Sequence, residues 1–182
     1  MPNIKICYAP DNNYAIPCSI SIQSVMNTIS NEISVKFLIL DGGLTDDNKN
    51  IITQIIDLHK NAIVEFVKVN DKEFSEYYTE AWKTSATYRF KIDSLLKNYD
   101  KVLYLDCDII VNKSIAELYN IDLGNNIIAM VPDIWYKKQN KRFPKKKQPY
   151  FNTGVCLFNL ELFRKENISE KLISYYKTNL AS

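Results

Sequence analysis

The chain has 182 residues, of which 46% are hydrophobic, and this composition is typical of one globular domain. Its 23 Lys and Arg residues nearly balance 21 Asp and Glu residues, but seven of the basic residues lie in segment 137–147, so we expect no nucleic-acid partner. Four glycines cannot form the GxGxxG or GxxxxGK[ST] nucleotide-binding loops, and one histidine with four scattered cysteines excludes the standard zinc spacings.

Short apolar runs alternate with segments of helical period along the chain. The predicted strands are 4–9, 35–40, 62–69, 101–106, 127–131 and 153–160. The predicted helices are 17–28, a helix capped by Thr45 or Asp46 that continues to Leu58, 88–96 and 160–176. Nearly continuous apolar strands separated by helices predict an α/β fold in one domain, residues 1–182, with a mostly parallel sheet covered by helices on both faces.

Ligands of such sheets bind beyond the carboxyl ends of the strands. This rule selects three loops, and each of them contains aspartate: 10–14, 41–46 and 106–110. In the first loop, Asp11 could accept a hydrogen bond from a ring N–H and Tyr14 could stack on a flat base. An ordinary turn is the alternative interpretation, because Asp and Asn are common turn residues.

Asp106 and Asp108 are the only two aspartates separated by one residue, and they follow the apolar run KVLYL. On an extended backbone both carboxylates would point to one side, with Cα atoms ~6.6 Å apart, while Cys107 would pack inside. One divalent cation can bridge this span, and hard carboxylate oxygens suit Mg²⁺ or Mn²⁺. The alternative is a solvated end of a strand.

Five blocks, in this order, resemble glycosyltransferase family 8, the retaining galactosyl- and glucosyltransferases that include glycogenin and bacterial lipo-oligosaccharide galactosyltransferases. The blocks are YAPDNNYAIPCSISIQSVMN, FLILDGGLTDDN, TSATYRFKI, DKVLYLDCDIIVNKSIAELYNIDL and PYFNTGVCLFNL. The resemblance implies a Rossmann-like GT-A fold that binds UDP-glucose or UDP-galactose with Mn²⁺ or Mg²⁺. It also implies transfer of the hexose to a glycan or lipid-linked acceptor with retention of configuration.

The resemblance also implies roles for individual residues. Asp106 and Asp108 match the metal ligands of the family. Arg89, Asp133 and Asn152 match catalytic positions around the diphosphate and the sugar, although the local sequence alone would make Arg89 a surface charge of a helix. Gly154 matches a close approach of the backbone, for which a bulge is the alternative. The full set matching donor and cofactor contacts is Ala9, Asp11, Asn13, Tyr14, Arg89, Asp106, Cys107 and Asp108.

Two features of the family do not occur in residues 1–182. They are a late histidine that completes the metal site and a DQD-like segment beside the reacting sugar, so we expect the chain to lack the C-terminal part of the family. His59 is expected on the second helix, exposed or half-buried, and cannot replace that histidine. These missing features favour one alternative, a chain that binds UDP-sugar without turnover. A second alternative is a phosphatase of the haloacid dehalogenase type, because LYLDCDIIV also resembles the first motif of those enzymes.

The remaining expectations concern the cysteines, the location and the basic segment. We expect Cys7, Cys18, Cys107 and Cys156 to be buried free thiols in a reducing compartment. No secretory signal and no stretch of ~20 apolar residues is present, so we expect a cytoplasmic protein. Segment 137–147 is expected to be a solvated loop, and its charge suggests attraction of an anionic acceptor or contact with a membrane surface. The oligomeric state is not predicted.

Overall fold

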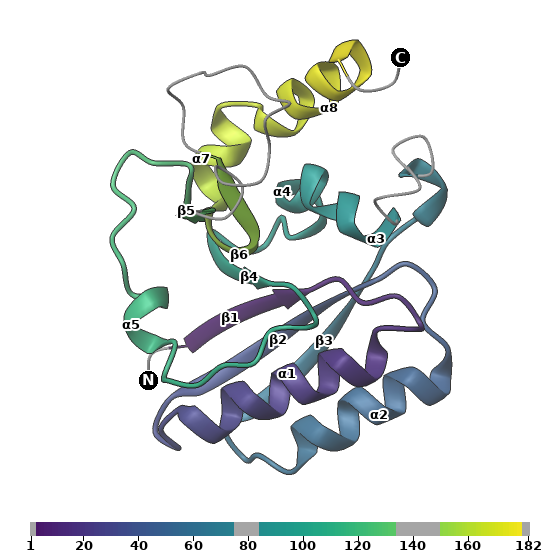
Figure 1. The fold of residues 1–182 in the computed structure, drawn as a ribbon, viewed down its shortest axis with the longest axis vertical. Helices are drawn as coiled ribbons and strands as arrows, with labels where there is room; N and C mark the ends of the chain where they lie inside the picture. Colours follow the sequence, from purple (N-terminus) through teal and green to yellow (C-terminus); the bar gives the residue numbers. More distant parts are fainter. Residues whose placement is uncertain (1–2, 75–83, 134–149, 180–182) are drawn as a thin grey trace.

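A computed structural model of the chain describes residues 3–74, 84–133 and 150–179 (Figure 1). Six strands form one sheet in the order β3-β2-β1-β4-β6-β5. Strands β1 to β4 are parallel, whereas β6 is antiparallel to both of its neighbours. The predicted mostly parallel sheet is therefore confirmed. The strands are β1 Asn3–Tyr8, β2 Ser34–Asp41, β3 Ala62–Lys68, β4 Lys101–Leu105, β5 Ile128–Pro132 and β6 Phe151–Asn159.

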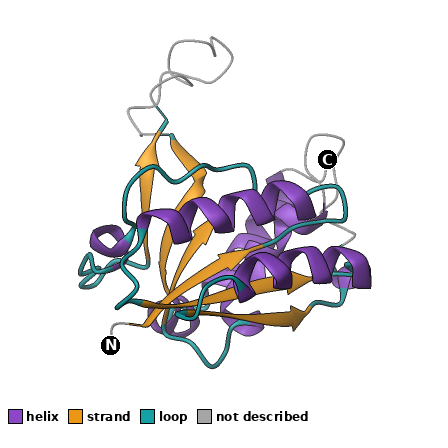
Figure 2. Ribbon diagram, turned by 90° about the horizontal axis from the view of Figure 1, so that it is seen from below, coloured by secondary structure: helices purple, strands orange, loops and turns teal. Residues whose placement is uncertain are grey.

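Helices cover both faces of the sheet, as predicted. Figure 2 shows the two long helices α1 and α2 lying across one face, which α5 also covers. The other face packs against the 3₁₀ helix η3, α4, α7 and α8. The bounds are α1 Ala15–Thr28, α2 Asp46–Asp57, η1 Asp71–Glu73, α3 Thr84–Thr87, η3 Tyr88–Lys91, α4 Ile92–Leu95, α5 Ala116–Tyr119, α7 Leu160–Lys165 and α8 Ile168–Asn179.

Strand β2 shows why the apolar runs predicted this arrangement. Its side chains alternate between the faces, so Phe37 and Ile39 join the cluster under α1 and α2, while Leu38 and Leu40 join the opposite cluster. All four side chains are fully buried. A strand that is buried on both faces needs apolar residues at every position, and VKFLIL nearly meets this condition.

Several predicted boundaries differ from the structure. Segment 88–96 is not one α-helix, because it divides into the 3₁₀ helix η3 and the short helix α4. The predicted helix 160–176 is broken at Asn167, whose φ of 52° lies in the left-handed region that Asn tolerates and that ends α7. Helix α2 begins after Thr45, whose hydroxyl accepts the N–H of Asn48 at 3.3 Å, and it ends before Leu58, which is exposed.

All four cysteines are free and buried, which confirms that part of the prediction. His59 lies just beyond the end of α2 and not within it; it is half-buried, and its Nε2 lies 3.3 Å from Oε1 of Gln23. No helix in the described part of the chain has the length and apolar character needed to cross a membrane.

The direction of β6 determines which residues lie at the carboxyl edge of the sheet. Because β6 is antiparallel to β4 and β5, its first residues lie where those two strands end. Residues that follow β1, β2, β4 and β5 therefore meet the residues that begin β6 at one edge. This edge holds the three aspartate-containing loops that the sequence singled out.

Candidate functional site

The first two loops at the carboxyl edge are joined by the side chain of Asn12. Its Oδ1 accepts the N–H of Thr45 at 2.9 Å and a hydrogen bond from Asn48 at 2.8 Å. Its Nδ2 donates to the carbonyl of Gly43 at 3.2 Å. One amide therefore fixes the loop after β1 to the loop that begins α2.

Aspartates hold the shape of each of these loops. Asp11 Oδ1 accepts the N–H groups of Asn13 at 2.8 Å and Tyr14 at 3.0 Å. Asp41 Oδ1 accepts two N–H groups of the next loop, and its Oδ2 lies 2.7 Å from the amine of Lys49. Burial alone would raise the pKa of Asp41, but Lys49 and the two N–H donors outweigh it and hold that pKa below its ordinary value. The carboxylate therefore stays charged and keeps the loop in place.

A cleft of about 340 Å³ opens between these loops and the turn that precedes Arg89. The hydroxyl of Tyr88 lies in its wall and donates to Asp71 Oδ1 at 2.5 Å. Burial, this hydrogen bond and the charges of Asp71, Asp41 and Asp11 raise the pKa of Tyr88, so the hydroxyl keeps its proton. The wall is rich in hydrogen-bond acceptors, because Asp11, Asn12 and Asp71 line it. The cleft is lined by Pro10, Asp11, Asn12, Gly42, Gly43, Leu44, Asp71, Thr84, Ser85 and Tyr88.

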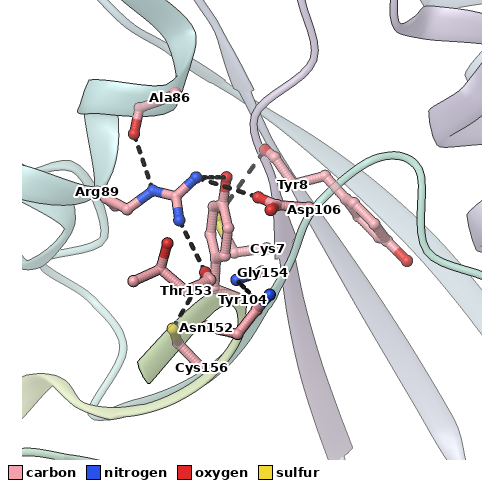
Figure 3. A network of polar contacts seen from close by, with 10 residues as sticks. All are labelled: Cys7, Tyr8, Ala86, Arg89, Tyr104, Asp106, Asn152, Thr153, Gly154 and Cys156. Atoms are coloured by element: carbon pink, nitrogen blue, oxygen red, sulfur yellow. Dashed lines mark hydrogen bonds and ion pairs between the residues drawn. The ribbon is translucent and has the colours of Figure 1, made fainter. Parts of the chain in front are cut away.

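Arg89 follows Tyr88 of the cleft wall, and its guanidinium contacts three segments of the chain (Figure 3). Its Nε donates to the carbonyl of Ala86 at 2.8 Å and its Nη1 to the carbonyl of Thr153 at 2.7 Å. Its Nη2 donates to Asp106 Oδ1 at 3.0 Å and to the hydroxyl of Tyr104 at 3.1 Å. Arg89 is thus not the surface charge that the local sequence suggested, because only 12% of its side chain is exposed.

Arg89 keeps its charge although it is largely buried. Burial alone would lower its pKa, but Tyr104 and the carboxylate of Asp106 outweigh burial and raise that pKa. The guanidinium carbon also lies 4.5 Å from the ring centroid of Tyr104, a cation–π distance. The site therefore contains a fixed positive charge next to one of the two predicted metal ligands.

The Asp106–Asp108 segment differs from the prediction of an extended backbone. Strand β4 ends at Leu105, and a turn follows in which the N–H of Ile109 points to the carbonyl of Asp106 at 3.4 Å. Alternation along a strand therefore does not set the directions of the two carboxylates. Cys107 is buried in the core cluster, as predicted, while Asp108 is exposed and Asp106 is partly exposed.

Gly154 leaves room for the carboxylate of Asp106. A Cβ at this position would lie 2.7 Å from Asp106 Oδ2 and 3.1 Å from Asn152 Oδ1. The bulge expected as the alternative is present, because the register between β5 and β6 shifts between Met130 and Val131. A close approach of this backbone to a donor sugar stays a prediction. The side chain of Asn152 accepts the N–H of Gly154 at 2.8 Å and so belongs to the same turn of backbone.

The other predicted residues lie at the same edge but contribute differently. Ala9 is buried in the core cluster on the α4 face of the sheet, and Tyr14, which is 41% exposed, stands at the start of α1. Asp133 follows β5 and its N–H donates to the carbonyl of Tyr150. The basic segment 137–147 lies outside the described residues, so its role as an acceptor-binding loop stays a prediction.

The chemistry of Asp106 and Asp108 suits one divalent cation. Asp106 Oδ1 is bound to Arg89, while Oδ2 faces the space that Gly154 leaves. Hard carboxylate oxygens are the ligands of Mg²⁺ and Mn²⁺, whose other positions are commonly filled by phosphate and water. Within residues 3–74, 84–133 and 150–179 no group of three or more His, Cys, Asp or Glu side chains could hold a metal.

Sequence reasoning missed three residues that shape the site. Asn12 is a common turn residue, so nothing in the sequence distinguishes its bridging role. Tyr104 looked like one more apolar residue of a strand, and Tyr88 like the start of a helix. The only signal for Tyr88 is the pair Gly42 and Gly43, because glycine permits another side chain to approach the backbone closely.

The sequence model described as Glycosyl transferase family 8 matches residues 5–182. The chain belongs to glycosyltransferase family 8. This membership favours the family interpretation of the DCD segment over the phosphatase alternative.

Relatives in family 8 include enzymes of lipopolysaccharide synthesis. The lipopolysaccharide 1,3-galactosyltransferase of Salmonella typhimurium is 30% identical over 180 residues, which are 95% of this chain and 53% of that protein. The lipopolysaccharide glucosyltransferase WaaO of Escherichia coli is 29% identical over 179 residues, covering 94% of this chain and 52% of that protein. This chain therefore spans about half the length of these relatives.

A family 8 fold is also supported by solved structures. The galactosyltransferase LgtC, solved with donor and acceptor sugar analogues, superposes with a TM-score of 0.78 at 24% identity. The superposition covers 96% of this chain and 64% of that one. At this identity the likeness supports the GT-A fold, which confirms the fold prediction.

Replacing Gly154 tests whether the position of Asp106 depends on the missing side chain. Gly154→Ala places a methyl group against Asp106 Oδ2, so we expect Mn²⁺ affinity to fall about tenfold, the size typical of a disturbed metal ligand. The measurement is a titration with Mn²⁺ in the presence of UDP. Gly124→Ala is the control, because it strains a φ of 51° far along the chain from this turn. Unchanged Mn²⁺ affinity in Gly154→Ala would contradict the placement.

Proposed function

We propose that this chain forms the donor-binding part of a retaining hexosyltransferase that uses UDP-glucose or UDP-galactose. The observation that supports this best is the ion pair between Asp106 and Arg89, the residue that directly follows Tyr88 of the cleft wall along the chain. Tyr88 and Arg89 are consecutive in the chain. Tyr88 lines the cleft, while Arg89 binds Asp106 of the predicted metal site. A nucleotide with its base in the cleft and its diphosphate near Asp106 matches this order.

The base of the donor would lie in the acceptor-rich cleft. Asp11 contributes a carboxylate there, and the N–H of a uracil ring is a suitable donor to it. Tyr14, at the start of α1, offers an exposed ring that can stack on a flat base. Ala9 and Asn13 would complete this loop through close packing and backbone contacts.

The diphosphate would lie near Arg89, Asp106 and Asp108. A divalent cation held by the two carboxylates would neutralise negative charge on the departing UDP. Arg89 would contribute a second, permanent positive charge, and its bonds to the carbonyls of Ala86 and Thr153 hold it in place. Cys107 would contribute only its backbone, because its thiol is buried in the core.

The sugar would lie toward the start of β6, where Asn152 and Asp133 stand near each other in the paired ends of β5 and β6. We propose that these polar side chains orient the hexose relative to the leaving diphosphate. Retention of configuration then needs no nucleophile from the described residues, because attack and departure can occur on the same face of the sugar. The acceptor is proposed to be a glycan or lipo-oligosaccharide, by analogy with the lipopolysaccharide enzymes among the relatives.

Binding without turnover is the second candidate function. It is favoured by the donor set at the metal site, where the described residues supply two carboxylates and no third His, Cys, Asp or Glu ligand. Such a chain would bind UDP-sugar and a metal, yet would not transfer the sugar by itself.

The metal assignment is tested by removing one negative charge at a time. Asp106→Asn and Asp108→Asn each replace a hard anionic ligand with a neutral amide, so we expect Mn²⁺-dependent UDP binding to be abolished. Isothermal calorimetry with and without Mn²⁺ measures this. Asp57→Asn, at the exposed end of α2, is the matched control and should bind as the unaltered chain does. Metal-independent binding of equal strength in the two site variants would refute the assignment.

Turnover is tested by following the release of UDP. With Mn²⁺ and UDP-glucose or UDP-galactose, a working donor site should hydrolyse the donor slowly even without acceptor, and Arg89→Ala should reduce this rate. A chain that binds UDP tightly but releases none from either donor would support binding without turnover.

A further inference from the structure

A second cavity adjoins the cleft and shares two residues with it. This cavity, of about 650 Å³, is lined by Gly42, Lys68, Val69, Asn70, Asp71 and Lys72. Gly42 and Asp71 also line the cleft. The two spaces therefore adjoin at Gly42 and Asp71.

The hydroxyl end of Tyr88 lies against both of these shared residues. It donates to Asp71 Oδ1 at 2.5 Å, and it lies so close to the backbone of Gly42 that a Cβ there would be 1.8 Å from the hydroxyl oxygen. Any side chain at position 42 would therefore displace the end of the Tyr88 ring. We call Gly42, Asp71 and Tyr88 together the partition.

The partition is rigid on the side of Tyr88. This residue is only 3% exposed, and its ring packs edge-on against Phe74 with ring centroids 5.0 Å apart. Tyr88 belongs to the core cluster on its face of the sheet, so the ring cannot turn aside without opening that cluster. A ligand in the cleft therefore meets a fixed wall.

We propose that Tyr88 determines nucleobase specificity by size, admitting a one-ring pyrimidine and excluding a two-ring purine. The proposal rests on the proposed function, in which the base of the donor occupies the cleft. With the partition in place, the base can extend no further than the Tyr88 hydroxyl. Without the ring of Tyr88 the cleft would join the second cavity, and the added space would accept a second fused ring.

The aromatic ring of Tyr88 is the part that would select between bases, whereas its hydroxyl would only hold the ring in position. The hydrogen bond to Asp71 orients the ring, while its carbons Cζ and Cε2 lie against Gly42, a residue that lines both spaces. Tyr88→Phe keeps those carbons and should keep the selectivity. Tyr88→Ala removes them and should lose it.

The test compares the dissociation constants of UDP and GDP, measured with Mn²⁺ for each variant. We expect Tyr88→Ala to reduce the preference for UDP over GDP at least tenfold, the order of discrimination that a shape-fitted pocket supplies. Tyr88→Phe should change this ratio by less than about fivefold, the usual effect of one neutral hydrogen bond. Tyr176→Ala is the matched control, because it removes a buried tyrosine from the same core cluster away from the cleft.

A ratio of affinities is insensitive to the fraction of protein that is folded. If Tyr88→Ala does not fold, Tyr88→Leu removes the ring while retaining apolar volume and is measured in its place. The proposal is overturned if the ratio in the ring-deleted variant equals that of the unaltered chain, or if Tyr176→Ala changes it equally. If the unaltered chain binds no UDP, the proposed function itself fails, which is a different result from binding UDP without selectivity at Tyr88.

Discussion

The buried guanidinium of Arg89 is the interaction on which the rest of the site depends. A largely buried cation is tolerated only when its donors are satisfied, and here two carbonyls, a hydroxyl and a carboxylate satisfy them. Those partners come from α3, β4 and its following turn, and β6. The same contacts that permit the buried charge therefore fix Asp106 relative to the cleft.

The reversed direction of β6 makes this arrangement possible. A sixth parallel strand would place its first residues at the opposite edge of the sheet, whereas antiparallel β6 brings Thr153 and Gly154 to the edge where β4 ends. Thr153 then supplies a carbonyl to Arg89, and Gly154 supplies space to Asp106. The site thus divides into a polar cleft, where we propose that the base binds, and a charged end, where we propose that the diphosphate binds, with residues 88 and 89 between them.

The sequence predicted the elements well where one local pattern decided them. Buried β2 requires an apolar run, and Thr45 before α2 has the side chain of a helix cap. Prediction from the sequence failed where the position of a side chain depends on residues that are distant in the chain. The burial of Arg89 depends on β6, and the fit of Tyr88 against Gly42 joins segments that no local pattern connects. The turn at Asp106 was missed because the apolar run before it gives no sign of where pairing stops.

A crystal structure of the chain grown with UDP and Mn²⁺ tests the central claim most directly. We expect an anomalous manganese peak in contact with the carboxylates of Asp106 and Asp108 and with the diphosphate, with the uracil in the cleft beside Asp11 and Tyr88. Manganese bound at other residues, or UDP bound away from this cleft, would contradict it.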